Sequence, residues 1–409
     1  MNDNSDSTTR IDAVIDGQFS LMRDVRRYLH ANPEPSGEES NTAALIVDQL
    51  RSIGLQPKLV ANDCGVIVDS DGDQVQQASS DNSRHRIAVR ADTDALRIQD
   101  IKNASYASCV PGIMHACGHD VHTATVLGMA VSLAKAQQDG LLPATVRWRA
   151  IFQPEEENNR GALKMVDAGC LDGVQAIIAL HVDPSRDVGT VGTRTGSFTA
   201  DCVALEVVIS GRGGHAARPH ESFDPIAAAA QLISSVYLFI PRRVDTQEPV
   251  VVSFGQINGG NNSNVIPDRV VLRGTMRTLS DSVTVSTLAH IRRLAQGIAD
   301  ASQTQIEVST TSGPPAVHND SALNALIKSS AQKLLGAENV QAIRRPSMGG
   351  EDFANYLSTV PGAMFRLGCK KKSGDTTLLH SPDFDIDETA MSIGAKILAR
   401  TVIAWNQMH

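Results

Sequence analysis

Three strand-like runs, separated by helical stretches, constrain the fold of this chain most strongly. The runs cover residues 86–91, 145–152 and 174–180, and the stretches between them lie near 120–138 and 160–168. Strands that alternate with helices build a sheet that is covered by helices on both faces. The sequence therefore predicts an α/β domain.

The pattern changes in the middle of the chain. Segments 203–210 and 268–276 alternate apolar with polar residues, which is typical of antiparallel strands with one exposed face. Helices are predicted at 225–239 and 282–301. Two helices on one face of an antiparallel sheet form a compact α+β unit, which is small enough to be an insertion.

The two ends of the chain are expected to form one domain around this unit. Apolar residues at helical spacing predict amphipathic helices at 11–30 and 387–405. We predict that residues 1–197 and 313–409 form an α/β domain with a mixed sheet covered by helices. The inserted α+β domain would cover residues 198–312.

Polar side chains follow the predicted strands of the α/β domain. Asp94 comes after the first strand, Glu156 and Glu157 after the second, and His181 after the third. Open α/β sheets bind ligands outside the carboxyl ends of their strands. These four residues are therefore candidates for a single site.

Segment 114–122 (MHACGHDVH) concentrates side chains that bind metals. Thiolate, imidazole and carboxylate are ligands of borderline-soft divalent ions such as zinc. Cys117 and His119 are two residues apart, so an extended backbone points both side chains the same way, and Gly118 permits a sharp turn. The alternative is a helix start with surface histidines, and the segment alone favours a metal site only slightly.

Three consecutive glutamates, Glu155 to Glu157, follow the second predicted strand. Surface runs of glutamate are common, but after a buried strand like charges repel one another unless cations compensate them. A metal-activated water also needs a neighbouring carboxylate as base, so one glutamate would be a ligand and one the base. His181 and His380 are further candidate ligands, although either histidine alone is more often a satisfied core residue.

Taken in order, these segments resemble the M20 metallopeptidase family, specifically its amidohydrolase branch of N-acyl amino acid, hippurate and indole-acetyl amino acid hydrolases. The matching segments are RRYLHANPEPSGEE (26–39), RADTDAL (90–96), MHACGHDVHTA (114–124), FQPEEE (152–157), LHVDP (180–184), GRGGHAARPH (211–220), NVIPD (264–268), GTMRT (274–278), GGEDF (349–353) and LLHSPDF (378–384). They span almost the whole chain, which makes a chance similarity very improbable.

The resemblance implies a site for two divalent ions, zinc or manganese, with cobalt also compatible. The implied ligands are Cys117, His119, Glu157, His181 and His380. Glu156 would be the general base, and Asp94 would orient a ligand imidazole or the backbone. The sequence leaves open which ligand bridges the two ions.

The chain departs from the family pattern beside the glutamates. Glu155 stands where a small residue is usual, and Asn158-Asn159-Arg160 replaces a glycine-rich stretch. We keep Glu156 as the base because it is the penultimate glutamate of the run, as in the family. His122, within the cysteine motif, is interpreted as structural.

The resemblance also implies that the inserted domain acts as a lid or in dimerisation. His215, after two glycines, would reach the site of a partner subunit and donate to the oxyanion. Asn264 and Arg277 would hold the free carboxylate of the substrate, since the fork of an arginine suits a two-oxygen anion. Without the resemblance, Arg277 would be interpreted as a surface cross-strand charge. We therefore expect a homodimer or a higher homo-oligomer.

The predicted function is hydrolysis of the amide bond of N-acyl or N-aroyl amino acids, which are small-molecule substrates. Alternatives within the family are a dipeptidase, which needs an acidic group for the free amine of its substrate, and an N-carbamoyl amino acid hydrolase. From another class, a catalytically inactive metal-binding scaffold would have lost the base or a ligand, and none is lost here.

Composition narrows the partners further. A formal net charge of −8 gives no basic footprint for nucleic acid. No apolar stretch approaches the length that crosses a bilayer, and the first residues lack the order of a signal peptide. Six scattered cysteines fit no disulfide framework, so we expect a cytoplasmic protein.

Overall fold

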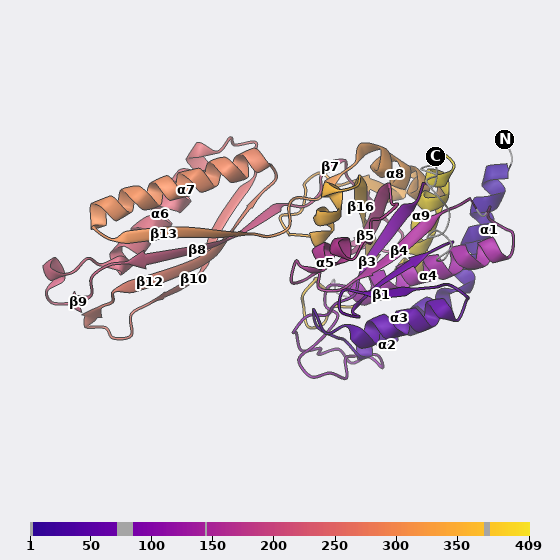
Figure 1. The fold of residues 1–409 in the computed structure, drawn as a ribbon, viewed down its shortest axis with the longest axis horizontal. Helices are drawn as coiled ribbons and strands as arrows, with labels where there is room; N and C mark the ends of the chain where they lie inside the picture. The colour runs from indigo at the N-terminus through magenta and orange to yellow at the C-terminus, as the bar shows by residue number, and fades with distance from the viewer. Residues whose placement is uncertain (1–2, 72–84, 144, 372–376) are drawn as a thin grey trace. The chain divides into compact units, whose positions relative to one another are not determined.

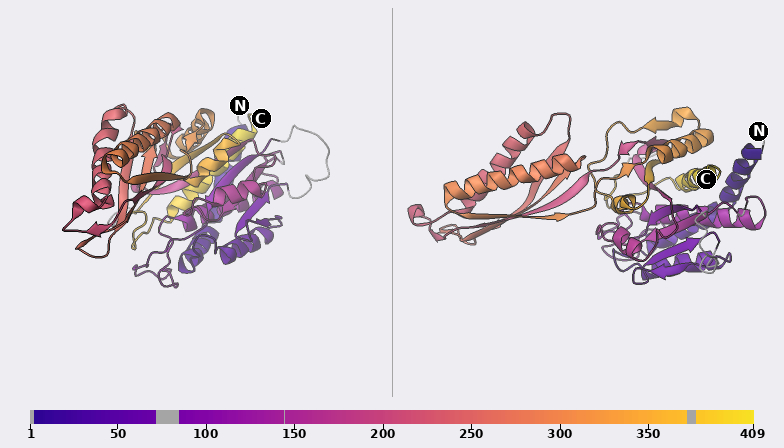
Figure 2. Two further views of the ribbon diagram at one scale, coloured as in Figure 1. Left: turned by 60° about the vertical axis from the view of Figure 1, so that its left-hand side comes forward. Right: turned by 45° about the horizontal axis from the view of Figure 1, so that its top comes forward.

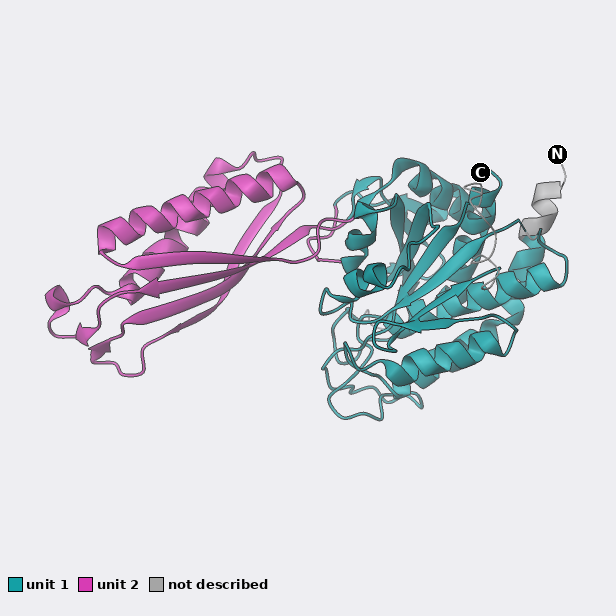
Figure 3. Ribbon diagram, viewed as in Figure 1, with its two compact units in different colours: residues 1–198, 318–345, 352–409 teal, residues 199–317, 346–351 magenta. Residues whose placement is uncertain are grey.

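The computed structural model describes residues 3–71, 85–143, 145–371 and 377–409. Internal contacts divide the chain into two compact units (Figure 3). Unit 1 comprises Met1–Phe198, His318–Arg345 and Asp352–His409, and unit 2 comprises Thr199–Val317 and Pro346–Glu351. The short segment Pro346–Glu351 belongs to unit 2, whereas the sequence boundaries put it in the α/β domain.

Unit 1 contains a mixed sheet of eight strands in the order β1-β2-β4-β3-β5-β16-β6-β15 (Figure 1). The central strands β3, β4, β5 and β16 run parallel, whereas β1, β2 and β6 add antiparallel pairs. The strand bounds are β1 Lys58–Val60, β2 Gly65–Asp69, β3 Ile87–Asp92, β4 Trp148–Gln153, β5 Ala176–Asp187, β6 Val191–Thr193, β15 Val340–Ala342 and β16 Gly362–Lys370. The predicted α/β class with a mixed sheet is confirmed.

The helices of unit 1 cover this sheet. They are α1 Asp3–Gly17, α2 Phe19–Ala31, α3 Ser40–Arg51, α4 His119–Gln138, α5 Gly161–Asp167, α8 Ser321–Leu335 and α9 Thr389–Asn406, with short 3-10 turns at Ala337–Asn339 and Asp352–Ser358. Helix α4 packs against α1, α2, α9 and β3, so almost every residue of it is buried (Figure 1). A helix that is apolar all round can only be stable in such a position.

The N-terminal helix differs from its prediction. The apolar spacing predicted one helix over 11–30, but α1 ends at Gly17 and α2 begins at Phe19. Glycine costs about 1 kcal/mol relative to alanine inside a helix, which favours a break at this point. Both helices bury their apolar faces, so the periodicity was correct and only the continuity was wrong.

Unit 2 is an antiparallel sheet with two helices. The strand order is β10-β12-β8-β13, with bounds β8 Asp201–Ser210, β10 Val250–Gly259, β12 Arg269–Thr278 and β13 Gln305–Ser312. Helices α6 (Pro225–Arg243) and α7 (Asp281–Ser302) lie side by side on one face of this sheet (Figure 2). The α+β architecture predicted for the insert is confirmed.

Short pairs and caps complete the fold. In unit 2, β9 (Gly214–His215) pairs with β11 (Val265–Ile266), and a 3-10 turn covers Pro219–Glu221. In unit 1, β7 (Gly196–Ser197) pairs with β14 (His318–Asn319). Within the described ranges, no helix has both the length and the apolarity that a membrane span requires.

Candidate active site

The candidate site lies where strands β3 and β4 end in unit 1. Asp92 is the last residue of β3 and pairs with Gln153, the last residue of β4. His181 lies on β5, the other neighbour of β3, and His119 is the first residue of α4. The sheet edge predicted from sequence therefore carries these side chains.

Gly118 makes the turn that brings Cys117 and His119 into this edge. Its φ of +91° lies in the left-handed region, which side chains with a Cβ rarely adopt. A Cβ at this position would also lie 2.4 Å from Cγ2 of Val182 on β5. Only glycine satisfies both constraints, so α4 can begin against β5.

The Cys117 thiol lies between two histidines. Its Sγ is 3.5 Å from Nε2 of His181 and 3.3 Å from Nε2 of His380. The same His380 nitrogen lies 3.5 Å from Oε1 of Glu157. Residues that are far apart in sequence thus meet at one sulfur.

His119 is held so that one nitrogen faces the cluster. Its Nδ1 donates to the carbonyl oxygen of Asp94 at 2.9 Å and to Oδ1 of the same residue at 3.0 Å. Nε2 is then left 3.9 Å from Oε2 of Glu156 and 3.9 Å from Oε1 of Glu157. Asp94 also accepts the backbone N–H of Glu157 at 3.0 Å, so this carboxylate orients two candidate ligands.

His181 is likewise held so that its Nε2 faces the cluster. Its Nδ1 donates to the carbonyl oxygen of Val182 at 2.8 Å, and a carbonyl can only accept. The lone pair of His181 therefore lies on Nε2, the atom that faces Cys117. A metal-binding histidine usually donates its other ring N–H to a carbonyl or carboxylate in this way.

The donor set fits two divalent cations. Nε2 of His119 and Oε1 of Glu157 are buried and have no hydrogen-bond partner among the described residues. Buried polar atoms are normally satisfied, so such atoms call for an ion or a ligand. Cys117 with His119 and His181, and Cys117 with Glu157 and His380, each form a group whose ligand atoms lie within 4.8 Å of one another.

Burial shapes the charge of this cluster. It raises the pKa of the Cys117 thiol far above its ordinary value, and the neighbouring His119 offsets only part of the shift. Burial likewise raises the pKa of Glu157, against the opposing charges of His119 and His380. A cation would reverse both shifts, because ligands bind metal in their deprotonated forms.

The structure separates the roles of Glu155 and Glu156. Glu155 forms an ion pair with Lys164, and its φ of +55° turns the backbone between the two glutamates. Glu156 instead places Oε2 near His119, and its Oε1 accepts the backbone N–H of Asp352 at 3.4 Å. Of these two glutamates, Glu156 is the one beside the ligand cluster.

His122 belongs to the scaffold rather than to the ligand set. Its Nε2 accepts the backbone N–H of Val182 at 2.9 Å, so its Nδ1 carries the proton that it donates to Asp92 at 2.6 Å. Both nitrogens are therefore engaged. Asp92 and His119 lie close enough to His122 to suggest a metal, but the hydrogen bonds of His122 argue against it as a ligand.

Sequence reasoning assigned no role to several residues that build the site. Asp352, in the GGEDF segment, accepts from Arg90 at 2.8 Å and from Gln153, and it donates its N–H to Glu156. Glu39, in the PEPSGEE segment, accepts the N–H of Glu155 at 2.8 Å. Both residues are acidic and lie in segments that match the family, yet neither was assigned a ligand role. That combination is the sequence signal that could have identified them.

Unit 2 holds the three remaining candidates at two separate places. His215 on β9 pairs with Val265, the residue after Asn264, and both candidates are exposed. Arg277 lies near the other end of β12, where its Nη1 donates to the carbonyl of Met348 at 2.8 Å. The nine residues from Arg269 to Arg277 span about 26 Å of strand, so unit 2 does not bring Arg277 and Asn264 together.

Comparison with known proteins agrees with this geometry. The sequence model of peptidase family M20/M25/M40 matches residues 88–404. The chain belongs to peptidase family M20.

Two M20 relatives and one solved structure show how far the likeness extends. An N-acetyl-L-cysteine deacetylase of Bacillus subtilis is 41% identical over 90% of this chain and 84% of its own length. An IAA-amino acid hydrolase of Arabidopsis thaliana is 35% identical over 93% of this chain and 84% of its own length. The Bacillus subtilis YXEP protein, described as a dinuclear metal binding peptidase from the M20 family, matches with a TM-score of 0.80 and 32% identity over 96% of this chain and 100% of that one. This M20 chain is a metal-dependent amidohydrolase.

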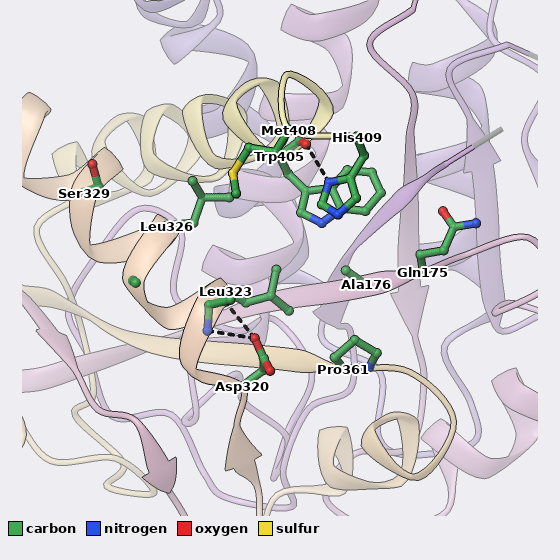
Figure 4. Close-up of a pocket in the computed structure, with 12 residues that line it drawn as sticks. Gln175, Ala176, Asp320, Leu323, Leu326, Ser329, Pro361, Trp405, Met408 and His409 are labelled. Carbon is green, nitrogen blue, oxygen red and sulfur yellow. Dashed lines mark hydrogen bonds between the residues drawn. The ribbon is translucent and has the colours of Figure 1, made fainter. Parts of the chain in front are cut away.

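A pocket of about 520 Å³ lies elsewhere in unit 1 of this M20 chain (Figure 4). It opens where β5 and β16 begin, and its apolar lining includes Leu323 and Leu326 of α8 together with Trp405 and Met408 near the end of α9. The candidate ligands lie elsewhere in unit 1 and are not among the described residues that line this pocket. The pocket is therefore separate from the M20 site.

A pH-dependent stability is expected from Glu39. Burial raises its pKa from 4.5 to about 7, so the unfolded chain ionises this carboxyl first and stability falls as the pH rises from about 4.5 to 7. Glu39→Gln keeps an acceptor for Glu155 but cannot ionise. We expect the variant to gain about 1–3 kcal/mol over the wild type at pH 8 relative to pH 5.

Urea unfolding at both pH values, in the presence of a chelator, measures this difference. Glu38→Gln is the matched control, because Glu38 is exposed and pairs with Arg97 on the surface. An identical pH dependence for wild type and Glu39→Gln would show that Glu39 is ionised in the folded protein.

Proposed function

We propose that this chain hydrolyses the amide bond of N-acyl or N-aroyl amino acids with two divalent ions. The observation that carries the proposal is the meeting of two ligand groups at Cys117, with Glu156 beside them. The two relatives described above are named for substrates that contain an amino acid, which supports this substrate class.

The proposed ligands are Cys117, His119, Glu157, His181 and His380. Cys117 belongs to two of the groups of potential ligands, so its thiolate would help to hold the ions. One thiolate with three imidazoles favours zinc, and the carboxylate makes manganese or cobalt compatible as well. Asp94 would fix the orientation of His119 and the backbone of Glu157, as its three hydrogen bonds already do here.

Proton transfer would be the task of Glu156. When bound, the ions would polarise the scissile carbonyl and make a water more acidic. Glu156 takes a proton from that water on Oε2 as the water oxygen bonds to the carbonyl carbon. It would then give the proton to the amide nitrogen as the carbon–nitrogen bond breaks, which leaves a carboxylic acid and a free amino acid.

A partner subunit would complete the substrate site. His215 and Asn264 lie together at one end of unit 2, whereas Arg277 lies at the other. If His215 reaches the site of the partner subunit to stabilise the oxyanion, the neighbouring Asn264 would reach the same site. The carboxylate of the substrate would then meet Arg277 of one chain and Asn264 of the other.

The surface of unit 2 supports dimerisation. Strand β10 is an edge of its sheet, and Val251 and Ile257 on it are exposed. Leu238 and Phe239 of the adjacent helix α6 are also exposed. An open strand edge next to exposed apolar side chains is a favourable surface for a second copy of the chain.

A dipeptidase needs an acidic side chain for the free amine of its substrate, and the sequence offers two candidates, Glu155 and Glu351. The carboxylate of Glu155 is paired with Lys164, which argues against it in this role. Glu351 lies close to Glu156 and Asp352, so a dipeptidase remains a second alternative. An N-carbamoyl substrate differs only in its acyl group and remains an alternative within the same chemistry.

The first test of this function concerns the base. We expect Glu156→Gln to retain both metal ions but to lose at least about a hundredfold in kcat, the usual scale for loss of a general base. Glu155→Gln is the matched control and should be much milder, since Glu155 faces Lys164. Hydrolysis of a panel of N-acyl amino acids, read as amine release, measures both, and the reverse ranking would assign the base to Glu155.

The second test concerns the thiolate. Removal of metal should abolish activity, increase alkylation of Cys117 and lower the melting temperature, because an ion that binds only the folded state stabilises it. Mass spectrometry of alkylated peptides measures the thiol. Cys170 is a buried internal control that lies outside the ligand set. Equal alkylation of Cys117 with and without metal would mean that this thiol is merely buried.

The third test concerns His215. We expect His215→Ala to lose about 10²–10³ in kcat, the scale of a lost oxyanion donor, with unchanged metal content. Co-expressed Glu156→Gln and His215→Ala chains should form mixed dimers in which one site has both wild-type groups. Activity above that of either parent supports donation across the interface. Freely mixed dimers that stay inactive would place His215 in its own subunit or outside the reaction.

A further inference from the structure

A buried arginine joins the two segments that carry the proposed ligands. Arg26, on α2, is fully buried. Its Nε donates to Oδ2 of Asp120 at 2.9 Å, its Nη2 to Oδ1 of Asp385 at 3.0 Å and its Nη1 to Oε1 of Glu388 at 3.3 Å. The ring of Tyr106 lies 4.6 Å from the guanidinium carbon. Each nitrogen of the guanidinium thus contacts a different carboxylate.

The three carboxylates come from two segments of unit 1 that are far apart in the sequence. Asp120 directly follows His119 in the first turn of α4. Asp385 lies five residues after His380, and Glu388 immediately precedes α9. One guanidinium therefore links the segment that carries Cys117 and His119 to the segment that carries His380.

The segment that carries His380 depends on such anchors. The hydroxyl of Thr377 donates to the carbonyl of Asp385 at 3.0 Å and accepts its N–H at 3.1 Å, which closes a loop around His380. The N–H of His380 donates to the carbonyl of Ala116 at 2.8 Å. His380 itself has a φ of +63°, a conformation that persists in a non-glycine residue only where neighbouring contacts determine it.

The two ligand segments differ in how firmly the core holds them. His119 starts the buried helix α4 and is fixed by Asp94. The side chain of His380 is 51% exposed, and its loop is tied to the core through Asp385 at the base and Ala116 at the tip. Loss of the Arg26 link should therefore displace His380 more than His119.

We propose that Arg26 is a positioning residue that sets the place of His380 relative to Cys117 and thereby the affinity for the ion held with Glu157 and His380. This inference rests on the proposed function. The fork of an arginine can reach three carboxylates in different directions, whereas a lysine presents a single point charge. Buried ion pairs are also weak evidence for stability alone, which leaves geometry as the reason for this arrangement.

Arg27 provides a matched control. It is the next residue on α2, it binds Glu388 at 2.9 and 2.7 Å, and its guanidinium lies 5.0 Å from the Tyr106 ring. Its described ion pair is with Glu388, so it touches the same neighbours without spanning the two ligand segments. Asp385→Asn is a second test variant, because it weakens the link of Arg26 to the His380 loop and leaves the link to Asp120 in place. It also alters the contacts of Asp385 with Tyr106 and Lys371.

The experiment measures zinc binding to the full-length metal-free protein by competition with a chelating dye. The wild type and Arg27→Lys should bind two ions with similar affinities. Arg26→Lys and Asp385→Asn should weaken one of the two ions about 10–100-fold, the scale for loss of a residue that orients a ligand, and the other ion much less. His380→Ala should weaken the same ion, and its combination with Arg26→Lys should be less than additive.

The outcomes distinguish a failure of the proposed function from a failure of the positioning role of Arg26. If the wild type binds no zinc through Cys117 and His380, the proposed function fails. If the wild type binds two ions and Arg26→Lys binds both equally tightly, the positioning role is overturned, even where the melting temperature of the variant falls. Additive effects of Arg26→Lys and His380→Ala would likewise overturn it.

Discussion

The sulfur of Cys117 lies between the imidazoles of His181 and His380, and the rest of the catalytic unit is arranged around that contact. A thiol in this buried position resists ionisation, because removal from water disfavours the charged form. His181 and His380 turn their Nε2 atoms toward it, and the other ring nitrogens of His181 and His119 are tied to carbonyls or, for His119, also to a carboxylate. The cluster is electrostatically incomplete by itself, and divalent cations are the charge that would complete it.

The fold brings these groups together through its strand ends and one glycine. Parallel strands place their carboxyl ends at one edge of the sheet. Asp92 and the glutamate run are therefore neighbours in space although they are far apart in sequence. Gly118 then lets α4 begin against β5, since a side chain there would meet Val182. The dipole of α4 places partial positive charge at His119, in the region where carboxylates gather.

The sequence predicted the type of site better than the contacts between its residues. Local pattern was sufficient to predict the sheet edge from the strand ends, whereas the candidate ligand set came from the resemblance of the ordered motifs to the M20 family. The choice of Glu156 over Glu155 came from the family pattern alone. The structure supports it through the ion pair of Glu155 with Lys164, a residue on the next helix that no spacing rule identifies. The burial of Glu39 and Arg26 depends on long-range packing, and the placement of Asn264 far from Arg277 depends on strand register.

Three residues of the site have backbone conformations that non-glycine residues rarely adopt. Glu155, Asn159 and His380 all have positive φ values without being glycines, and all three lie in the segments that carry the base and the ligands. Each such residue costs about 1–3 kcal/mol, which the surrounding structure must offset. Lys164 and Glu39 hold Glu155, and Ala116 holds His380 by its backbone. Local sequence preference is thus overruled where the candidate ligands converge, because contacts with neighbouring residues hold the backbone there.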